Sequence, residues 1–288
     1  MKYLNKCLIC ESEDIKQHSA MVVPFIAERV WGRKAFGVKL NQCRKCGFSF
    51  FNARLDDAEM TRLYSGYRDE EYLKQRNKHE PWYTQKLQER LFADKTTLKN
   101  RHYSLSGLFK KLFGNIRIKC ILDFGGDKGQ LIDGIFDDAE KFVHEVSDVE
   151  PLSGIKKADP HSMIPYDLVI CSNVLEHVSS PADIINQISQ FVTKNKTILY
   201  IDVPLENPYD CKILTRRIIQ ILLLFLLRFK DFMAMFGSGM LTNMHEHINY
   251  FTEESLRMLL IKNDFDNIKI SIEQINNYKI ICCFCTKK

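Results

Sequence analysis

Two pairs of cysteines have the spacing that a metal site requires. Cys7 and Cys10, and again Cys43 and Cys46, form Cys-x-x-Cys motifs. Four thiolates in two such pairs suit tetrahedral zinc, and Gly47 permits the tight turn of a zinc knuckle. A closed four-sulfur site leaves no coordination position for a substrate, so we expect a structural metal. Four unrelated buried thiols and a redox dithiol are the alternatives.

A glycine-rich turn follows an apolar run in residues 121–130. Gly125 and Gly126 let the backbone turn tightly and approach a ligand, and Gly129 lets a following helix pack close to the strand. Asp123 adds a carboxylate at the floor of such a pocket. The pattern is typical of a nucleotide-type site in a parallel α/β sheet, although a turn of this kind also occurs without a ligand.

A third group, His245-Glu246-His247, combines two imidazoles with a carboxylate. A histidine held by an acid can remove a proton from an attacking group. The group precedes the helix start at Thr252, so its side chains are expected on a loop or short strand over a pocket mouth. Metal binding and a purely structural role are the alternatives.

Composition indicates a globular chain of ordinary type. Its 288 residues are 45% hydrophobic, and the net charge of +5 is spread along the sequence. Basic residues occur mostly in short pairs such as Lys110-Lys111, which makes nucleic acid an unfavoured partner. Ten cysteines without a secretory signal pattern predict reduced thiols and a cytoplasmic location.

The longest apolar stretch covers residues 218–227. It is about half of the roughly 20 residues that a membrane-spanning helix needs, so no transmembrane segment is expected. Basic residues flank it, and residues 214–230 could therefore contact an anionic membrane surface. A buried or dimer-forming helix is the preferred interpretation, and a substrate lid is the third.

Alternating strand and helix patterns begin near residue 118 and must position these groups. A helix starts at Pro181 behind the cap Ser180, and another starts at Thr252. The last strands, 268–272 and 278–285, predict an antiparallel hairpin at the sheet edge. The remaining expected elements are strands at 118–124, 141–146, 167–171 and 197–203 and a helix from about 128.

Three motifs together resemble the class I S-adenosylmethionine-dependent methyltransferases: Leu122–Gly129, Tyr166–His177 and Val203-Pro204. The second is the most specific. The cysteine knuckles, the Tyr64/Tyr67 segment and residues 245–252 extend the resemblance to a zinc-containing subgroup that methylates sugars, including nucleotide-linked sugars. The resemblance covers nearly the whole chain.

The resemblance implies an α/β fold, a doubly wound Rossmann-like methyltransferase sheet with antiparallel C-terminal strands, preceded by a small zinc-binding module. The expected domains are a zinc module at 1–53, a helical connector or cap at 54–115 and an S-adenosylmethionine-binding domain at 116–288. Residues 205–250 would form an insertion on the substrate side.

The resemblance also implies which residues bind the cofactor. S-adenosylmethionine carries no phosphate, so the glycine turn needs only close backbone approach. Glu145, about 20 residues after the turn, would accept hydrogen bonds from the ribose hydroxyls, with Asp148 as the alternate. Ser172, Asn173 and Leu175 follow the next strand and would line the cofactor.

On the substrate side, the resemblance implies that Glu246 and His247 form an acid–histidine pair with His247 as the base. Tyr64 and Tyr67 would close the pocket, and His177 would orient the substrate or satisfy nearby backbone groups.

The expected reaction is transfer of a methyl group to a sugar or nucleotide-linked sugar for cell-surface polysaccharide biosynthesis. Oxygen is the expected acceptor atom, because the additional C-terminal domain of the sugar C-methyltransferases is absent. Asp127 also departs from the family, since many members have glycine there. The alternatives are methylation of another small metabolite, a sugar carbon or an amine, methylation of RNA, and a cofactor-binding partner subunit without activity.

Overall fold

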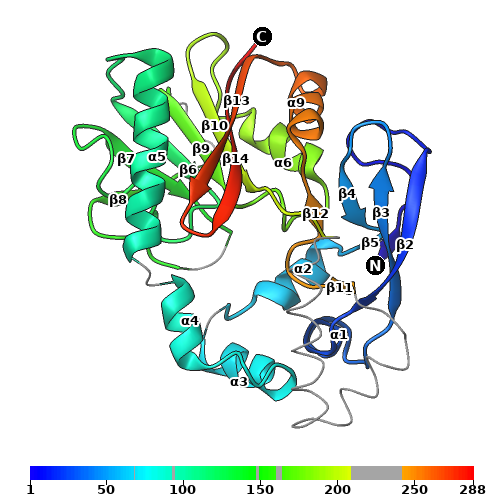
Figure 1. Cartoon of the computed structure of the whole chain (residues 1–288). Helices are drawn as coiled ribbons and strands as arrows, with labels where there is room; N and C mark the ends of the chain where they lie inside the picture. The colour runs from blue at the N-terminus through cyan, green and yellow to red at the C-terminus, as the bar shows by residue number, and fades with distance from the viewer. Residues whose placement is uncertain (68, 93–94, 147–148, 160–163, 209–241) are drawn as a thin grey trace. The chain divides into compact units, whose positions relative to one another are not determined.

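The structure is a computed structural model of the chain, and it describes residues 1–67, 69–92, 95–146, 149–159, 164–208 and 242–288 (Figure 1). Asp148 and the apolar stretch 218–227 therefore lie outside the described residues. Within the described part of the chain, no helix has both the length and the apolar character that crossing a membrane requires.

The described chain forms two compact units, and each is considered by itself. The first unit comprises Met1–Cys7, Glu11–Asp94 and Glu206–Tyr250, and the second comprises Leu8–Cys10, Lys95–Leu205 and Phe251–Lys288. The boundaries expected at 53 and 115 do not coincide with this division. The connector up to Asp94 and the described part of the expected insertion belong to the same unit as most of the cysteine-bearing segment.

The second unit is built on a seven-stranded sheet. Its strands are β6 (Cys120–Phe124), β7 (Glu140–His144), β8 (Ile155–Lys157), β9 (Leu168–Ser172), β10 (Ile198–Pro204), β13 (Phe265–Ile275) and β14 (Tyr278–Lys287). Their order is β13-β14-β10-β9-β6-β7-β8, in which β10, β9, β6, β7 and β8 are parallel and the β13–β14 hairpin is antiparallel. The predicted Rossmann-like sheet with antiparallel C-terminal strands is confirmed.

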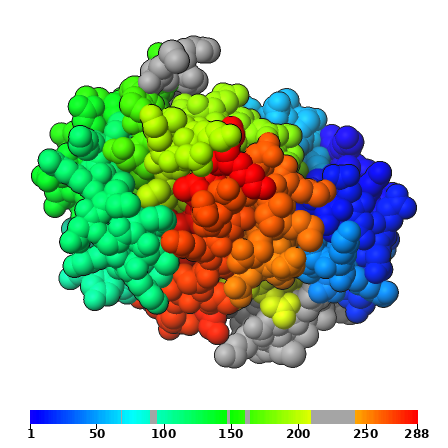
Figure 2. Space-filling view, turned by 90° about the horizontal axis from the view of Figure 1, so that it is seen from above, coloured from blue at the N-terminus to red at the C-terminus, as the bar shows by residue number. Residues whose placement is uncertain are grey.

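Three helices cover this sheet: α5 (Lys95–Phe113), α6 (Pro181–Ile188) and α9 (Glu253–Lys262). Leu105 and Phe109 of α5 pack against alternate strand residues such as Leu168 and Ile170, because successive side chains point to opposite faces. Figure 1 shows α5 on one face and α6 and α9 on the other. In the space-filling view, the C-terminal hairpin lies beside α5 at the surface (Figure 2).

The helix expected from residue 128 is wrong, because residues 127–138 form a series of turns. Asp127, Gly129, Gly134 and Phe136 all have positive φ angles, of 55°, 81°, 80° and 50°. A right-handed helix cannot pass through residues in the left-handed region. The glycine that was expected to aid helix packing instead belongs to a turn.

The first unit contains a five-stranded sheet with the order β11-β2-β3-β4-β12 and a ribbon formed by β1 and β5. The strands are β1 (Lys2–Tyr3), β2 (Ile15–Val22), β3 (Gly37–Cys43), β4 (Ser49–Phe51), β5 (Ala53–Arg54), β11 (Asn243–Met244) and β12 (Asn249–Tyr250). The helices are α1 (Pro24–Trp31), α2 (Asp57–Tyr64), α3 (Glu70–His79) and α4 (Gln85–Phe92).

The two short strands β11 and β12 flank the His245-Glu246-His247 loop. β11 pairs in parallel with β2, and β12 pairs antiparallel with β4. Met244 and Ile248 are buried in the same core as Phe25 and Tyr72. The loop is therefore fixed at both ends by a sheet that consists mainly of N-terminal strands.

Candidate functional site

The glycine-rich turn of the second unit is tightly packed. Gly125 has a φ angle of 72°, and a Cβ atom there would lie 2.7 Å from Val174 Cγ2. At Gly126 a Cβ atom would lie 2.3 Å from Asp123 Cγ. The turn therefore excludes side chains at both positions and holds its backbone close to Asp123.

Asp123 lies at the end of β6 and is only 1% exposed. Its Oδ2 atom has no hydrogen-bond partner among the described residues. Burial raises the pKa of Asp123 to about 7, against the opposing effect of the Arg101 cation. A buried carboxyl in this condition favours a cationic or hydrogen-bonding ligand.

Arg101 and Asp202 form a buried ion pair at the carboxyl edge of the sheet. Arg101 Nη2 lies 3.1 and 3.2 Å from the two carboxylate oxygens of Asp202 and also donates to Ser172 Oγ. Ser172 Oγ donates to Asp202 Oδ2 at 2.7 Å, and the Asn173 N–H donates to Oδ1 at 3.2 Å. Burial alone would lower the pKa of Arg101, but attraction to Asp202 outweighs it and the pKa is raised.

Ser172 and Asn173 were expected at this edge, whereas Arg101 and Asp202 were not singled out. The acid within the apolar run of β10 was the one available indication for Asp202. Arg101 lies on a helix without any distinguishing motif. Arg101 and Asp202 are 101 positions apart in the sequence, so only the fold brings them together.

The other predicted cofactor residues are distributed along the same strand ends. Glu145 follows β7, and its Oε2 accepts a hydrogen bond from the Asp127 N–H at 3.0 Å, which ties this carboxylate to the glycine turn. Leu175 is fully buried. The His177 side chain is 24% exposed and lies 3.8 Å from a carboxylate oxygen of the neighbouring Glu176.

The sulfur atoms of the predicted zinc ligands Cys7, Cys10, Cys43 and Cys46 lie within 4.8 Å of one another. The Sγ atoms of Cys7 and Cys46 are 3.6 Å apart. Zinc–sulfur bonds of about 2.3 Å in a tetrahedron place sulfur atoms about 3.8 Å apart. This donor set therefore fits zinc.

The backbone around the two cysteine pairs follows one pattern. The Glu11 N–H donates to Cys7 O at 3.0 Å, and the Gly47 N–H donates to Cys43 O at the same distance. Glu11 and Gly47 both have positive φ angles, of 61° and 74°. Two segments without sequence similarity beyond the cysteines thus form the same knuckle turn.

Glu246 of the first unit is held by α3. Its Oε1 accepts hydrogen bonds from the Tyr72 hydroxyl and, at 3.2 Å, from Arg76 Nη1. Arg76 Nε also donates to Glu80 Oε2 at 2.8 Å. Burial, reinforced by the Glu246 charge, raises the pKa of Tyr72, so its hydroxyl stays protonated and donates.

His245 has a defined tautomer. Its Nδ1 accepts a hydrogen bond from the Glu246 N–H at 2.9 Å, so the ring proton lies on Nε2, which is 2.7 Å from Glu80 Oε1. Burial alone would raise the pKa of Glu80, but His245 and Arg76 together lower it to about 2. Glu80 is therefore ionised at neutral pH.

His247 is oriented by a different carboxylate. Its Nδ1 atom lies 2.8 Å from Glu206 Oε2, and the two side chains are 33% and 37% exposed. Its carbonyl oxygen accepts from the Tyr250 hydroxyl at 3.3 Å. Sequence reasoning did not single out Glu206, nor Tyr72, Arg76 and Glu80.

Residues 97–270, more than half of the sequence, match a protein family described as a methyltransferase domain. The chain belongs to this family. It is an S-adenosylmethionine-dependent methyltransferase. No curated protein matches this methyltransferase.

Several solved structures are similar to the methyltransferase. Magnesium protoporphyrin IX methyltransferase (ChlM) from Synechocystis PCC 6803 is 15% identical with a TM-score of 0.44, and the match covers 68% of this chain and 88% of that chain. Plantazolicin methyltransferase BpumL is 12% identical with a TM-score of 0.44, over 75% and 94%. A putative O-methyltransferase from Nostoc punctiforme PCC 73102 is 14% identical with a TM-score of 0.44, over 72% and 60%.

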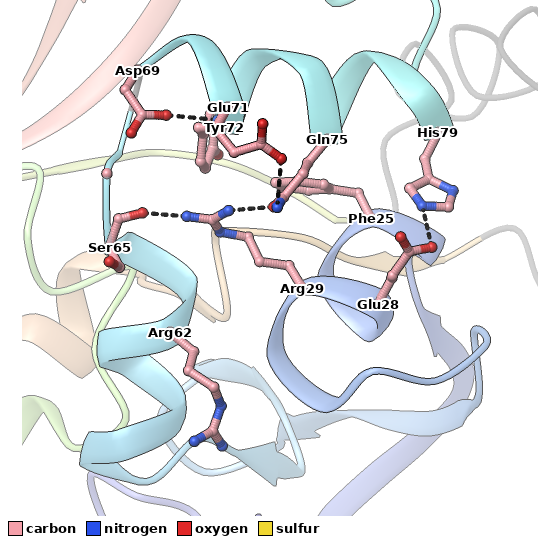
Figure 3. Close-up of a pocket in the computed structure, with 11 residues that line it drawn as sticks. Phe25, Glu28, Arg29, Arg62, Ser65, Asp69, Glu71, Tyr72, Gln75 and His79 are labelled. Atoms are coloured by element: carbon pink, nitrogen blue, oxygen red, sulfur yellow. Dashed lines mark hydrogen bonds and ion pairs between the residues drawn. The ribbon is translucent and has the colours of Figure 1, made fainter.

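The methyltransferase has a cavity of about 460 Å³ within its first unit (Figure 3). Arg29 crosses it, donating to Ser65 O and, at 2.5 Å, to Gln75 Oε1. Tyr72 lines the same cavity, so one side chain connects it with the Glu246 cluster. The full lining consists of Phe25, Glu28, Arg29, Arg62, Ser65, Gly66, Asp69, Glu71, Tyr72, Gln75 and His79.

The rings of Tyr64 and Tyr67 form an aromatic cluster with Tyr72, which lines the cavity. Their ring centroids are 5.3 Å apart, and the Tyr67 and Tyr72 centroids are 5.1 Å apart, both in edge-to-face geometry. Both tyrosines are half-buried against the core of the first unit. They support the position of Tyr72, and a role in closing a substrate pocket stays a prediction.

Proposed function

We propose that this methyltransferase methylates an oxygen of a sugar or nucleotide-linked sugar, in the cytoplasm, for cell-surface polysaccharide biosynthesis. The observation that carries the proposal is the His247–Glu206 pair. A sugar hydroxyl must lose its proton as it attacks, whereas a neutral amine attacks with its lone pair. A half-exposed histidine with a carboxylate partner suits the first type of acceptor.

We further propose that the cofactor lies over the glycine turn. When bound, S-adenosylmethionine supplies a methyl group on a positively charged sulfur. Asp123 would receive its ammonium group, and Gly125, Gly126 and Gly129 would let the backbone approach its amino acid moiety. The buried Oδ2 atom of Asp123 without a partner supports this assignment.

The remaining cofactor contacts are assigned by position. Glu145 would accept hydrogen bonds from the ribose hydroxyls, with its carboxylate held by the Asp127 N–H. Ser172, Asn173 and Leu175 would line the cofactor at the end of β9. The Arg101–Asp202 pair supports the position of Ser172 and Asn173.

On the acceptor side, His247 would take the hydroxyl proton, while Glu246 and His245 would hold the loop that carries it. Tyr64, Tyr67 and His177 are proposed to contact the acceptor. A cavity with acidic, basic and amide side chains on its walls suits a hydroxyl-rich ligand, and its volume lies within the usual range for small-molecule sites.

Zinc held by Cys7, Cys10, Cys43 and Cys46 would stabilise the fold without taking part in the reaction.

The experiment begins with cofactor binding by calorimetry on the zinc-loaded protein. Glu145→Ala should weaken binding about tenfold, the scale of one lost charged hydrogen-bond pair. Nucleotide sugars, free sugars, amines and RNA are then compared as acceptors by the formation of S-adenosylhomocysteine. We expect methylated nucleotide sugars with the native protein and none with His247→Asn. Methylation of amines or RNA alone, or full activity of His247→Asn, would contradict the proposal.

A further inference from the structure

We propose that Glu206 is a positioning residue that fixes the tautomer of His247 and thereby makes Nε2 the proton acceptor. The proposal rests on the proposed role of His247 as the base. It assigns a function to a residue that belongs to none of the motifs in the sequence. The contact that carries it is the 2.8 Å distance between His247 Nδ1 and Glu206 Oε2.

The loop that presents His247 is held on both sides. On the N-terminal side, His245 bonds to Glu80, and Glu246 bonds to Tyr72 and Arg76. On the C-terminal side, β12 pairs with β4. The backbone position of His247 is therefore set by its neighbours, and what remains to be set is the orientation of the ring and the site of its proton.

Glu206 sets both. An ionised carboxylate only accepts hydrogen bonds, so its partner nitrogen must carry a hydrogen. Nδ1 of His247 is therefore the protonated nitrogen, and the neutral ring has its lone pair on Nε2. His245 has the reverse arrangement, with its proton on Nε2, because its Nδ1 accepts from a backbone N–H. Two histidines separated by one residue thus hold opposite tautomers.

The difference assigns different tasks to the two rings. The Nε2 atom of His245 already carries a hydrogen, so it has no lone pair with which to accept another proton. In His247, Nε2 can accept the proton of the acceptor hydroxyl as the oxygen forms its bond to the methyl carbon. The electrons of the broken carbon–sulfur bond remain on sulfur, which becomes neutral, and the imidazolium of His247 faces the Glu206 carboxylate.

The test uses nitrogen-15 spectra of the eight histidines in the protein alone, assigned with a His247→Gln variant. In the native protein we expect His247 to carry its hydrogen on Nδ1. Glu206→Ala should move it to Nε2, the tautomer that free histidine side chains favour. Glu206→Gln keeps an acceptor oxygen and should retain the native tautomer.

The matched control is Glu80→Gln, which alters the carboxylate on His245 and should leave the His247 tautomer unchanged. An unchanged His245 tautomer in Glu206→Ala shows that the loop remains folded. A native His247 with its hydrogen on Nε2, or no change of tautomer in Glu206→Ala, would overturn the proposal. With an acceptor that the enzyme methylates, Glu206→Ala should reduce kcat about 100-fold with little change in KM.

Failure of this proposal can be distinguished from failure of the proposed function. The spectra need neither cofactor nor acceptor. If the tautomers behave as expected but only amines are methylated, Glu206 still positions His247, and the assignment of the acceptor is wrong. If nucleotide sugars are methylated and the tautomers are not as expected, the proposed acceptor is right and the proposed role of Glu206 is wrong.

Discussion

Replacing Asp123 by asparagine should stabilise the cofactor-free protein in a pH-dependent manner. The pKa of Asp123 rises from its ordinary value of 3.8 to about 7 in the folded protein because the carboxyl is buried. Below pH 3.8 the group is neutral in both the folded and the unfolded chain. Between pH 3.8 and about 7, the unfolded chain loses the proton first, so the free energy of unfolding falls as the pH rises.

The size of the effect follows from that interval. About 1.4 kcal/mol per pH unit over the interval from 3.8 to about 7 gives about 4 kcal/mol, fully developed at pH 8. At pH 5 only about 1.6 kcal/mol of it is present. Asparagine has the same shape and does not ionise, so Asp123→Asn should remove this loss. Its advantage over the native protein should therefore grow from pH 5 to pH 8.

Urea unfolding of the native protein and the variant at several pH values between 5 and 8, without cofactor, measures this difference. Asp133→Asn is the control, because Asp133 is an exposed acid on the same turn segment. A stability difference that is equal at pH 5 and pH 8, or a variant that is less stable than the native protein at pH 8, would refute the reasoning. The same variant should bind S-adenosylmethionine more weakly, because it cannot offer a charge to the ammonium group. Stability and affinity should thus change in opposite directions.

Three further predictions concern other parts of the structure. Cys43→Ser should lose the bound zinc and unfold at a lower temperature, as measured by metal analysis and thermal unfolding; retention of one zinc per chain would contradict it. Arg101→Met should destabilise the protein by about 3–5 kcal/mol because it leaves a charge at Asp202 buried and unpaired, and urea unfolding would show a smaller loss if Asp202→Asn is introduced as well. Gly125→Ala should weaken cofactor binding in calorimetry, because its Cβ atom would lie 2.7 Å from Val174 at a φ angle of 72°; unchanged affinity would show that the turn can relax.

The sheet of the second unit was predictable because its signals are local. Strands β6, β9 and β10 are apolar runs bounded by polar residues, and the caps of α6 and α9 lie next to the helices that they start. The short strand β8, which contains two lysines, lacks this signal and was not predicted. Ser180 Oγ accepts from the Asp183 N–H, and Thr252 Oγ1 accepts from the Ser255 N–H. The prediction of a helix from residue 128 was wrong. Gly129 was expected to help a helix pack against the strand, whereas its positive φ angle places it in a turn.

The acid and histidine cluster was predictable only in part. The sequence places His245, Glu246 and His247 together, but their partners lie far away along the chain. Tyr72 is 174 positions from Glu246, and Glu80 is 165 positions from His245. No pattern within one sequence connects such residues. The expected pairing of Glu246 with His247 used the acid adjacent in sequence, whereas the structure places Glu206 Oε2 at 2.8 Å from His247 Nδ1 and holds Glu246 on Tyr72 and Arg76.

Two buried acids of this protein illustrate how surroundings separate a structural carboxylate from a functional one. Glu80 and Asp123 are both almost inaccessible to water, and burial alone would raise the pKa of each. Glu80 contacts Arg76 and His245, so its pKa falls to about 2 and its charge is neutralised within the protein. Asp123 keeps an oxygen without a partner among the described residues, and its pKa stays near 7. Asp123 would therefore gain by binding a cation from outside, which is why we propose it, and not Glu80, as the acid that receives the ammonium group of the cofactor.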